Sequence, residues 1–509
     1  MITEKNVNSI YQKLLDQASK EFECSNYNVA LRNVENAARW AYNFNVFYTD
    51  SRAELLLKSI SRRCLEKKQA IIEKERFVVL DTEGLDNRGL TQQYLRALEA
   101  NHFEYLFITL RSDISPLKDT IAEIENSTYG HVITFEGKKL TLMEKAERIR
   151  NMIIQFHAGK VLLHLMPWDV SSLIAIYSIE GVESYNINLT DHAFWLGASF
   201  INFNIEFRPY GKTVSLQKRR LSLEQLLEYP FYPIKPLKNN FEGFPEIPHD
   251  SIVIFTGGAP YKMTDADNTF FLKIIDGILG LSPKVVVLVA GFSRNDVSFQ
   301  NNIKEMKHKD RVYNIGIRKD INEVYKHSDI YLQTYPSYGG LMTQYAIMNR
   351  KPVLNFVKKG EIISFEGMVN HFGKGTKCFE NYDEFISYGK RLIEDKEYRV
   401  SEGEKGYNLM MNEERFNKMF VEVIFNHKNN FSWPTIDIDY ESVSNSYISL
   451  AKIQNYAILR LLVNEYGCFR CLCLFPDCWH FILPWIYKNK LIYKIKNGVY
   501  RLFHGNNTL

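Results

Sequence analysis

Apolar residues along this chain follow two alternating patterns. In short runs almost every residue is apolar, as in Phe77–Asp81 and Lys284–Ala290. In the stretches between them, apolar residues recur at steps of three and four, which is the period of a helix. Strands that are apolar throughout, separated by helices, are typical of a parallel sheet covered on both faces. The pattern therefore predicts an α/β fold.

The predicted strands fall into two sets. The first set is Phe77–Asp81, Tyr105–Thr109, His131–Phe135, Val161–Leu165 and Tyr185–Leu189. The second set is Ile252–Thr256, Lys284–Ala290, Val312–Ile315, Ile330–Gln333 and Pro352–Phe356. Each set predicts one Rossmann-like, doubly wound domain, and in such sheets ligands bind beyond the carboxyl ends of the strands.

The segments around these two sets differ in pattern. Residues 1–75 show the helical period throughout, and Asp50-Ser51 is typical of a helix N-cap. Five proline residues between positions 230 and 250 predict a linker, since proline cannot sit inside helices or sheets. We therefore expect a helical N-terminal extension (1–75), a first α/β domain (76–230), a linker (231–250), a second α/β domain (251–430) and a C-terminal tail (431–509).

Composition narrows the class of protein only slightly. With 45% apolar and 24% charged residues in 509, the chain is of ordinary globular composition, which excludes wholesale disorder. A net charge of +4 does not indicate a nucleic acid partner. The first residues lack the pattern of a secretory signal, and the odd number of cysteines, 7, favours reduced thiols. We expect a cytoplasmic protein.

Glycine-rich loops follow two strands of the second set. Gly257 and Gly258 precede Lys262, and Gly339 and Gly340 open a predicted helix. Glycine lets a backbone approach an anion, and a helix N-terminus offers free N–H groups to it. Two further turns of the same sheet carry Arg294 and Arg318, which face either this edge or solvent. These residues predict a phosphate-binding edge.

An alternative remains for the first loop. It is a plain glycine turn if Thr264 and Asp267 only cap the helix that follows. Asp265 and Asp267 resemble a metal-binding pair, but we prefer capping and expect no metal site.

Titratable residues follow strands of the first set. His192 could act as a base, with Asp191 orienting it, and the alternative is a buried histidine beside a capping aspartate. His164 is a second candidate. Glu83 and Asp86 lie in the first loop at the same edge, although solvated loop charges explain them equally well.

At this point the sequence resembles a family. Residues 251–425 resemble the donor-binding half of a GT-B glycosyltransferase, through the Gly257-Gly258 loop, Arg311-Val-Tyr-Asn-Ile-Gly316, Glu323–Asp329, Pro336-Ser-Tyr-Gly-Gly340 and Lys351-Pro-Val353. The chain is most similar to bacterial enzymes of surface and capsular polysaccharide synthesis, in the glycogen synthase-like group.

The resemblance implies a function and a set of roles. It makes 76–230 the acceptor domain and 251–430 the donor-binding domain, and His192 then serves as the base or binds the transferred sugar. It implies a nucleotide-diphosphate sugar as donor substrate, a saccharide or lipid-linked glycan as acceptor, and no metal or other cofactor. Leu341, Thr343 and Gln344 then join Gly257, Gly258, Lys262, Arg294, Arg318, Gly339 and Gly340 at the donor, while Glu83, Asp86 and His164 face the acceptor. One departure stands out, because two glutamates of that group, spaced E-x7-E, are replaced here by Ser337 and Tyr345.

The C-terminal tail has a composition of its own. It is rich in aromatic residues, among them Trp479 and Trp485, and after Asp477 it carries Lys and Arg but no acidic residue. This composition favours an anionic membrane surface, at the inner face of the plasma membrane. Packing on the protein's own domains is the alternative, and a zinc site built from the clustered cysteines is disfavoured by their spacing.

Two other functions remain open at the level of sequence. A sugar-nucleotide epimerase can use the same fold without an acceptor. A non-catalytic scaffold would explain the missing glutamates as signs of a decayed donor site.

Overall fold

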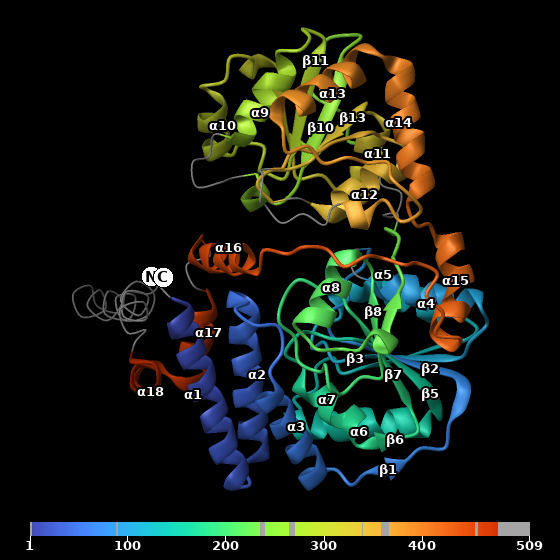
Figure 1. The fold of residues 1–509 in the computed structure, drawn as a ribbon, viewed down its shortest axis with the longest axis vertical. Coiled ribbons are helices and arrows are strands. Elements are labelled where there is room, and N and C mark those ends of the chain that lie inside the picture. The colour runs from blue at the N-terminus through green and yellow to red at the C-terminus, as the bar shows by residue number, and fades with distance from the viewer. Residues whose placement is uncertain are drawn as a thin grey trace, which may run out of the picture.

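The computed structural model describes residues 3–87, 90–234, 240–263, 270–337, 339–357, 366–453 and 457–476. The chain forms an N-terminal body and a C-terminal body stacked along the long axis of the molecule (Figure 1). Each body is built around one parallel sheet. The α/β class and the two Rossmann-like domains predicted from the sequence are confirmed.

The sheet of the N-terminal body has the strand order β4-β3-β2-β5-β7-β8-β9, and its neighbouring strands all pair parallel. The strands are β2 (Glu73–Asp81), β3 (Tyr105–Thr109), β4 (Gly130–Thr134), β5 (Ala158–His164), β7 (Glu183–Ile187), β8 (Phe203–Glu206) and β9 (Leu226–Glu228). The last two were not predicted, because they are short and polar residues interrupt them.

Helices cover both faces of this sheet. They are α4 (Thr91–Ala100), α5 (Lys118–Glu125), α6 (Leu142–Gln155), α7 (Val170–Tyr177) and α8 (Pro209–Gln217). Alternate residues of β2 serve the two faces: Phe77 and Val79 pack toward α4, while Val78 and Leu80 pack toward α6 and α7. Burial on both sides explains why this strand is apolar at each position from Phe77 to Leu80.

The sheet of the C-terminal body has the order β12-β11-β10-β13-β14, again parallel. Its strands are β10 (Ile252–Gly257), β11 (Val285–Ala290), β12 (Val312–Gly316), β13 (Ile330–Leu332) and β14 (Val353–Leu354). The helices are α9 (Phe270–Leu279), α10 (Val297–Ile303), α11 (Ile321–Lys326), α12 (Gly340–Met348), α13 (Tyr382–Glu394) and α14 (Lys396–Leu409). Strand β10 lies in the middle of the sheet, so the loop after it opens at the centre of the carboxyl edge.

The N-terminal helices are part of the first body rather than a separate unit. Helices α1 (Glu4–Glu23), α2 (Tyr27–Phe44) and α3 (Ser51–Cys64) share one apolar core with Val78 and Leu80 of the sheet. Asp50 caps α3 as predicted, since its carboxylate accepts a hydrogen bond from the Ala53 N–H at 2.8 Å. The helical prediction is wrong beyond Cys64, because a short strand, β1 (Lys68–Gln69), pairs there with β6 (Ile179–Glu180) and β2 follows.

The chain returns to the first body after α14. Helix α15 (Glu413–Phe425), which we expected with the donor domain, packs Phe416 and Phe420 into the core beneath β2. Helices α16 (Tyr440–Ile453), α17 (Ala457–Tyr466) and α18 (Cys468–Leu474) then lie against the N-terminal helices (Figure 1). The reason is the apolar face of α15, whose aromatic side chains pack against residues of the first body, among them Phe77 of β2 and Tyr94 of α4.

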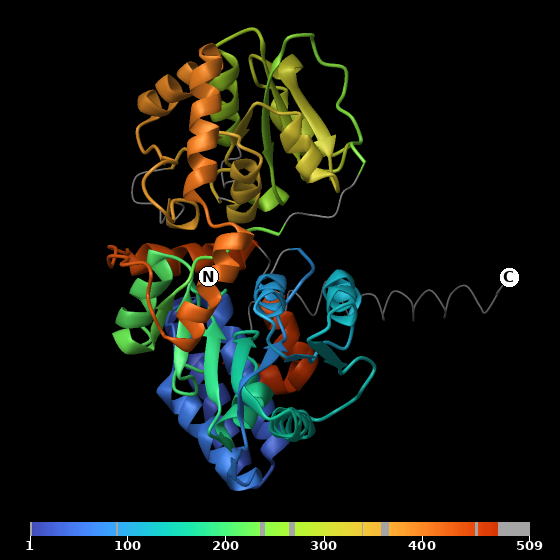
Figure 2. The same ribbon diagram turned by 90° about the vertical axis from the view of Figure 1, so that its right-hand side faces the viewer.

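The proline-rich connection contains no helix or strand in its described parts, 231–234 and 240–250. Its first residues are not exposed, because Phe231, Tyr232 and Ile234 pack into the core of the first body. The linker and the segment before α15 both run between the two bodies, as Figure 2 shows from the side.

Candidate active site

The carboxyl-end loops of the first sheet face the C-terminal body. The Tyr345 hydroxyl on α12 donates a hydrogen bond to the Asn87 carbonyl, in the loop after β2, at 3.0 Å. A Cβ on Gly367, in the short helix η5 (Glu366–Met368), would lie 2.8 Å from Cδ of Pro209, which opens α8. The loop after β2 and the start of α8 in the first body therefore lie against α12 and η5 of the C-terminal body.

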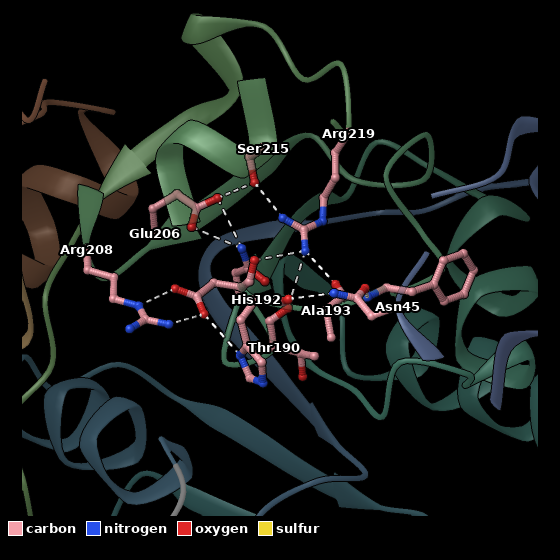
Figure 3. Close-up of polar contacts among 11 residues, drawn as sticks. Asn45, Thr190, His192, Ala193, Glu206, Arg208, Ser215 and Arg219 are labelled. Carbon is pink, nitrogen blue, oxygen red and sulfur yellow. Dashed lines mark hydrogen bonds and ion pairs between the residues drawn. The ribbon is translucent and has the colours of Figure 1, made fainter. Parts of the chain in front are cut away.

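The loop after β7 carries Asp191 and His192 (Figure 3). Asp191 is buried, and its carboxylate accepts hydrogen bonds from Arg208, with 2.7 Å between Nη2 and Oδ1. Burial opposes ionisation of Asp191, but the guanidinium outweighs it and lowers the pKa of the carboxyl to about 2. His192 Nδ1 lies 3.2 Å from Asp191 Oδ1, and its side chain is 46% exposed. The predicted contact is present: an ionised aspartate holds a histidine whose side chain is about half exposed.

Arg219 binds the backbone of the loop that carries Asp191 and His192. It is buried, and its Nη2 donates to the carbonyl oxygens of Thr190, Asp191 and Ala193, at 3.4, 3.1 and 2.6 Å (Figure 3). Three carbonyls converging on one guanidinium fix the backbone on both sides of His192.

The N-terminal helices hold the same loop from the other side. Asn45, the left-handed C-cap of α2, donates from Nδ2 to the His192 carbonyl at 3.0 Å and accepts from the Phe194 N–H at 2.9 Å. Glu54 of α3 accepts from the N–H groups of Gly197, Ala198 and Ser199, each at 2.9 Å. Helices outside the Rossmann frame thus position the candidate base.

Glu206, at the end of β8, forms a second buried carboxylate beneath the loop. Its oxygens accept from Asn188, Asn204 and Ser215. Burial raises the pKa of Glu206 to about 7, and its hydrogen bonds recover only part of the lost solvation.

His164 lies beneath the surface and not at it. Its Nδ1 is 3.0 Å from Asp81 Oδ2, and both side chains are fully buried. Burial opposes the charged form of both groups, but the attraction between them is stronger. The pKa of Asp81 is therefore lowered and that of His164 is raised. Asp81 also accepts from the N–H groups of Glu83 and Gly84, at 2.9 and 2.6 Å, so the pair shapes the loop after β2.

The two acidic residues of that loop have different surroundings. Asp86 accepts from the N–H groups of Asp119 and Thr120, both at 2.9 Å, so its carboxylate caps α5. Glu83 is partly buried beside His164 and His192, and burial raises the pKa of its carboxyl. Of the two, only Asp86 is committed to a helix cap.

On the C-terminal body, the loop after β10 depends on glycine. A Cβ at Gly291, where φ is +117°, would come within 1.8 Å of the Gly258 carbonyl oxygen. A Cβ at Gly257 would be 3.2 Å from Cβ of Ala290, while Gly258 has only ordinary contacts around it. The close approach of two backbones fixes this loop, and the surface of Gly258 stays accessible to a ligand.

Lys262 connects the two glycine loops. It ends the short helix η3 (Pro260–Lys262), and its Nζ lies 3.9 Å from the position that a Cβ on Gly339 would occupy. Gly339 is the N-cap of α12 and Gly340 its first residue. Burial lowers the pKa of the Lys262 ammonium, as expected of a cation in a partly enclosed position. An ammonium beside a helix N-terminus suits a phosphate group.

The remaining α12 candidates are oriented inward. The Thr343 hydroxyl donates to Gln333 Oε1 at 2.5 Å, and the Gln344 amide donates to the Met368 carbonyl at 3.2 Å. Leu341 packs on the core beside β10. They support the helix N-terminus.

The two arginines are placed differently. The Arg318 side chain is buried, donating to Asp320 Oδ1 and to the Gly243 carbonyl, each at 2.7 Å, so it holds the linker to the C-terminal body. Arg294 is 69% exposed and lies 3.8 Å from Glu242.

Sequence reasoning missed Arg219, Asn45, Glu54 and Glu206. Asn45 is 147 positions from His192, so no local pattern links the two. The sequence held only a weak signal for these residues. Asn45 directly follows a predicted amphipathic helix, and Glu54 and Glu206 are acidic residues inside otherwise apolar segments.

Among the described residues, no three His, Cys, Asp or Glu side chains gather where they could hold a metal ion. Within the same ranges, no helix has both the length and the apolarity to cross a membrane. Thr264, Asp265 and Asp267, and the tail beyond residue 476 with Trp479 and Trp485, lie outside the described residues.

Comparison with known proteins identifies the fold. No protein-family model matches the sequence, and no curated protein matches it. Among solved structures, a glycosyltransferase from Rickettsia africae is 13% identical, with a TM-score of 0.50, over 70% of this chain and all (100%) of that one. The Anabaena protein HepE, in complex with UDP and glucose, is 12% identical (TM-score 0.47, 69% of this chain and 99% of that one). A UDP-GlcNAc 2-epimerase from Neisseria meningitidis is 15% identical (TM-score 0.47, 69% and 99%). The chain therefore has the GT-B fold.

Proposed function

We propose that the protein is a glycosyltransferase that moves a sugar from a nucleotide-diphosphate sugar to a saccharide. One observation supports this most directly: Lys262 lies between two glycine loops at the N-terminus of α12, and the loops face the body that carries His192. The Rickettsia africae glycosyltransferase has the same fold.

The donor would bind with its diphosphate at Gly258, Lys262 and Gly339. As the bond between the anomeric carbon and the diphosphate oxygen breaks, negative charge grows on the leaving group. The Lys262 ammonium and the N–H groups of α12 stabilise that charge without a metal.

The acceptor hydroxyl would lose its proton to His192. With Nδ1 donating to Asp191, Nε2 is the nitrogen left to take the proton as the acceptor oxygen bonds to the anomeric carbon. Arg208 keeps Asp191 ionised, so the imidazolium that forms is stabilised by a carboxylate.

We further propose that the acceptor belongs to surface polysaccharide synthesis, as a saccharide or a lipid-linked glycan, and that the basic, aromatic tail binds an anionic membrane. A vesicle co-sedimentation assay with and without phosphatidylserine tests the tail. Binding that is unchanged when residues 477–509 are removed would contradict it.

The activity is tested by incubating the protein with UDP-, GDP- and ADP-sugars and measuring nucleoside diphosphate release. Release from one donor, lost in His192→Ala while nucleotide binding remains, is the expected result. Conversion of the donor to its epimer without release would identify an epimerase. Folded protein that binds neither UDP nor GDP in a calorimetric titration would indicate a scaffold.

A further inference from the structure

A small cavity lies beside the His192 loop, at the carboxyl ends of β5 and β7. Its water-accessible volume is about 20 Å³, enough for one or two water molecules. Apolar side chains, including Leu163 and Leu173, form part of its wall. The polar residues that line it are Glu83, Asn186, Asn188, Thr190 and Trp195.

Two polar atoms of these lining residues lack partners. Asn188 Oδ1 and Trp195 Nε1 are buried, and neither has a hydrogen-bond partner among the residues that the structure describes. A buried polar group left unpaired costs about 1–3 kcal/mol. The rest of Asn188 is well bonded, since its Nδ2 donates to Glu206. The unmatched carbonyl is therefore held in place and is not a side chain that has swung away from its partner.

The polar groups of the cavity define the ligand that it can take. Trp195 offers one N–H donor and Asn188 offers a carbonyl acceptor. Glu83 adds a carboxylate that accepts no hydrogen bond from the residues that the structure describes. A hydroxyl group both donates and accepts, so it can accept from Trp195 and donate to Asn188 or to Glu83. A phosphate or carboxylate only accepts and would meet the negative charge of Glu83. The chemistry fits a neutral, hydroxyl-bearing ligand.

We propose that this cavity is a specificity site for a neutral sugar acceptor and takes one hydroxyl or hydroxymethyl arm of that sugar. The proposal rests on the glycosyltransferase function proposed above. Because the cavity admits a single small group, the ring of the sugar stays in the cavity mouth beside His192. Trp195 donates to the arm and Asn188 accepts from it, which fixes which of the sugar's other hydroxyls meets the base.

The test uses methyl α- and β-glycosides of glucose, galactose, mannose and N-acetylglucosamine as probes, with the full chain and UDP present. Binding is followed by saturation-transfer difference NMR. At least one glycoside should bind, and Trp195→Phe, which keeps an aromatic ring and removes the N–H, should weaken it about five- to tenfold. Glu83→Gln should also weaken it.

A second measurement separates ligand contact from a structural effect. Analogues of the bound glycoside that lack one hydroxyl at a time should include one that binds wild type and Trp195→Phe equally, because its missing group is the Trp195 partner. Trp433→Phe is the matched control, since Trp433 lies on the segment before α16 and does not line the cavity. This control should bind as wild type does.

Three outcomes overturn the proposal. In the first, no glycoside binds to protein that binds UDP; in the second, Trp195→Phe and Glu83→Gln bind the glycoside as tightly as wild type does. In the third, every deoxy analogue binds Trp195→Phe more weakly than wild type. The first two would leave the cavity as a site for ordered water only. Glycoside binding that depends on Trp195 in a protein that fails to bind UDP would contradict the glycosyltransferase function and retain the sugar site.

Discussion

In the N-terminal body, buried side chains hold the loop that carries Asp191 and His192, whereas in the C-terminal body the loops at Gly258 and Gly339 are shaped by backbone. Arg219, Asn45 and Glu54 donate to or accept from the first loop along its whole length. The conformation of the two loops in the C-terminal body depends on glycines and one lysine. The difference follows from the chemistry. A base must be held within hydrogen-bond distance of the proton that it takes, while a diphosphate accepts hydrogen bonds from N–H groups in many directions.

Of the variants considered for the two bodies, Gly291→Ala should cause the largest loss in the free energy of unfolding. Its Cβ would collide with the Gly258 carbonyl oxygen, so the loop after β10 must shift or the C-terminal body loses stability, by more than about 3 kcal/mol. Denaturant unfolding measures the loss.

Gly137→Ala is the control for Gly291→Ala. Gly137 also has positive φ (+66°), but nothing lies near its Cβ position, so only the conformational cost of about 1 kcal/mol applies. Equal losses in the two variants would show that the close approach of the backbones is unimportant.

Glu206 tests the buried side chains of the first body through pH. Burial raises its pKa from 4.5 to about 7, so the folded protein binds this proton more tightly than the unfolded chain. Its contribution to the free energy of unfolding is fully present below pH 4.5 and is lost as pH rises to about 7, by about 3 kcal/mol.

In Glu206→Gln this fall in stability between the two pH values should disappear. Unfolding free energies measured across the range, for wild type and variant, check it. Parallel curves would mean that Glu206 is ionised in the fold.

Lys262→Ala tests the C-terminal body. Removing the ammonium between the glycine loops should weaken binding of the nucleoside diphosphate about ten- to a hundredfold, because hydrogen bonds to charged groups contribute about 1.5–3 kcal/mol. The melting temperature without ligand should hardly change. Calorimetric titration gives the affinity, and an unchanged value would remove Lys262 from the site.

Asn45→Ala asks whether the N-terminal helices position the base. It leaves the His192 carbonyl and the Phe194 N–H without this partner, so stability should fall by about 1–2 kcal/mol and turnover should fall with it. Asn43→Ala, which removes only a bond to Arg39 within α2, is the matched control. Full turnover in Asn45→Ala would show that α2 has no positioning role.

The smallest effect is expected from Tyr345→Phe. It removes the hydrogen bond to Asn87 across the two bodies, worth about 1 kcal/mol. Amide hydrogen exchange should rise in residues 82–87 and at the start of α12, with donor affinity changed less than twofold. Exchange rates equal to those of wild type would show that this contact does not hold the bodies together.

The sequence by itself determined the alternation of strands and helices, because burial of a parallel sheet on both faces leaves a mark at every position of its strands. It also located the glycine loops and the Asp191–His192 pair, since each is a local pattern at a strand end. The neighbouring helices were less certain at their ends, as residues 65–75 show, where strand pairing with β6 overrides a helical pattern.

Only the tertiary structure decided what each charged group does. Arg318, Asp86 and His164 carry the same kinds of group as Lys262, Glu83 and His192, yet ion pairs, a helix cap and burial commit them to the fold. The same holds for α15, whose aromatic face packs on the first sheet, and for Asn45 and Glu54, which hold a loop more than a hundred positions away. Contacts between distant segments depend on how the elements pack, and a single sequence records the elements but not the packing.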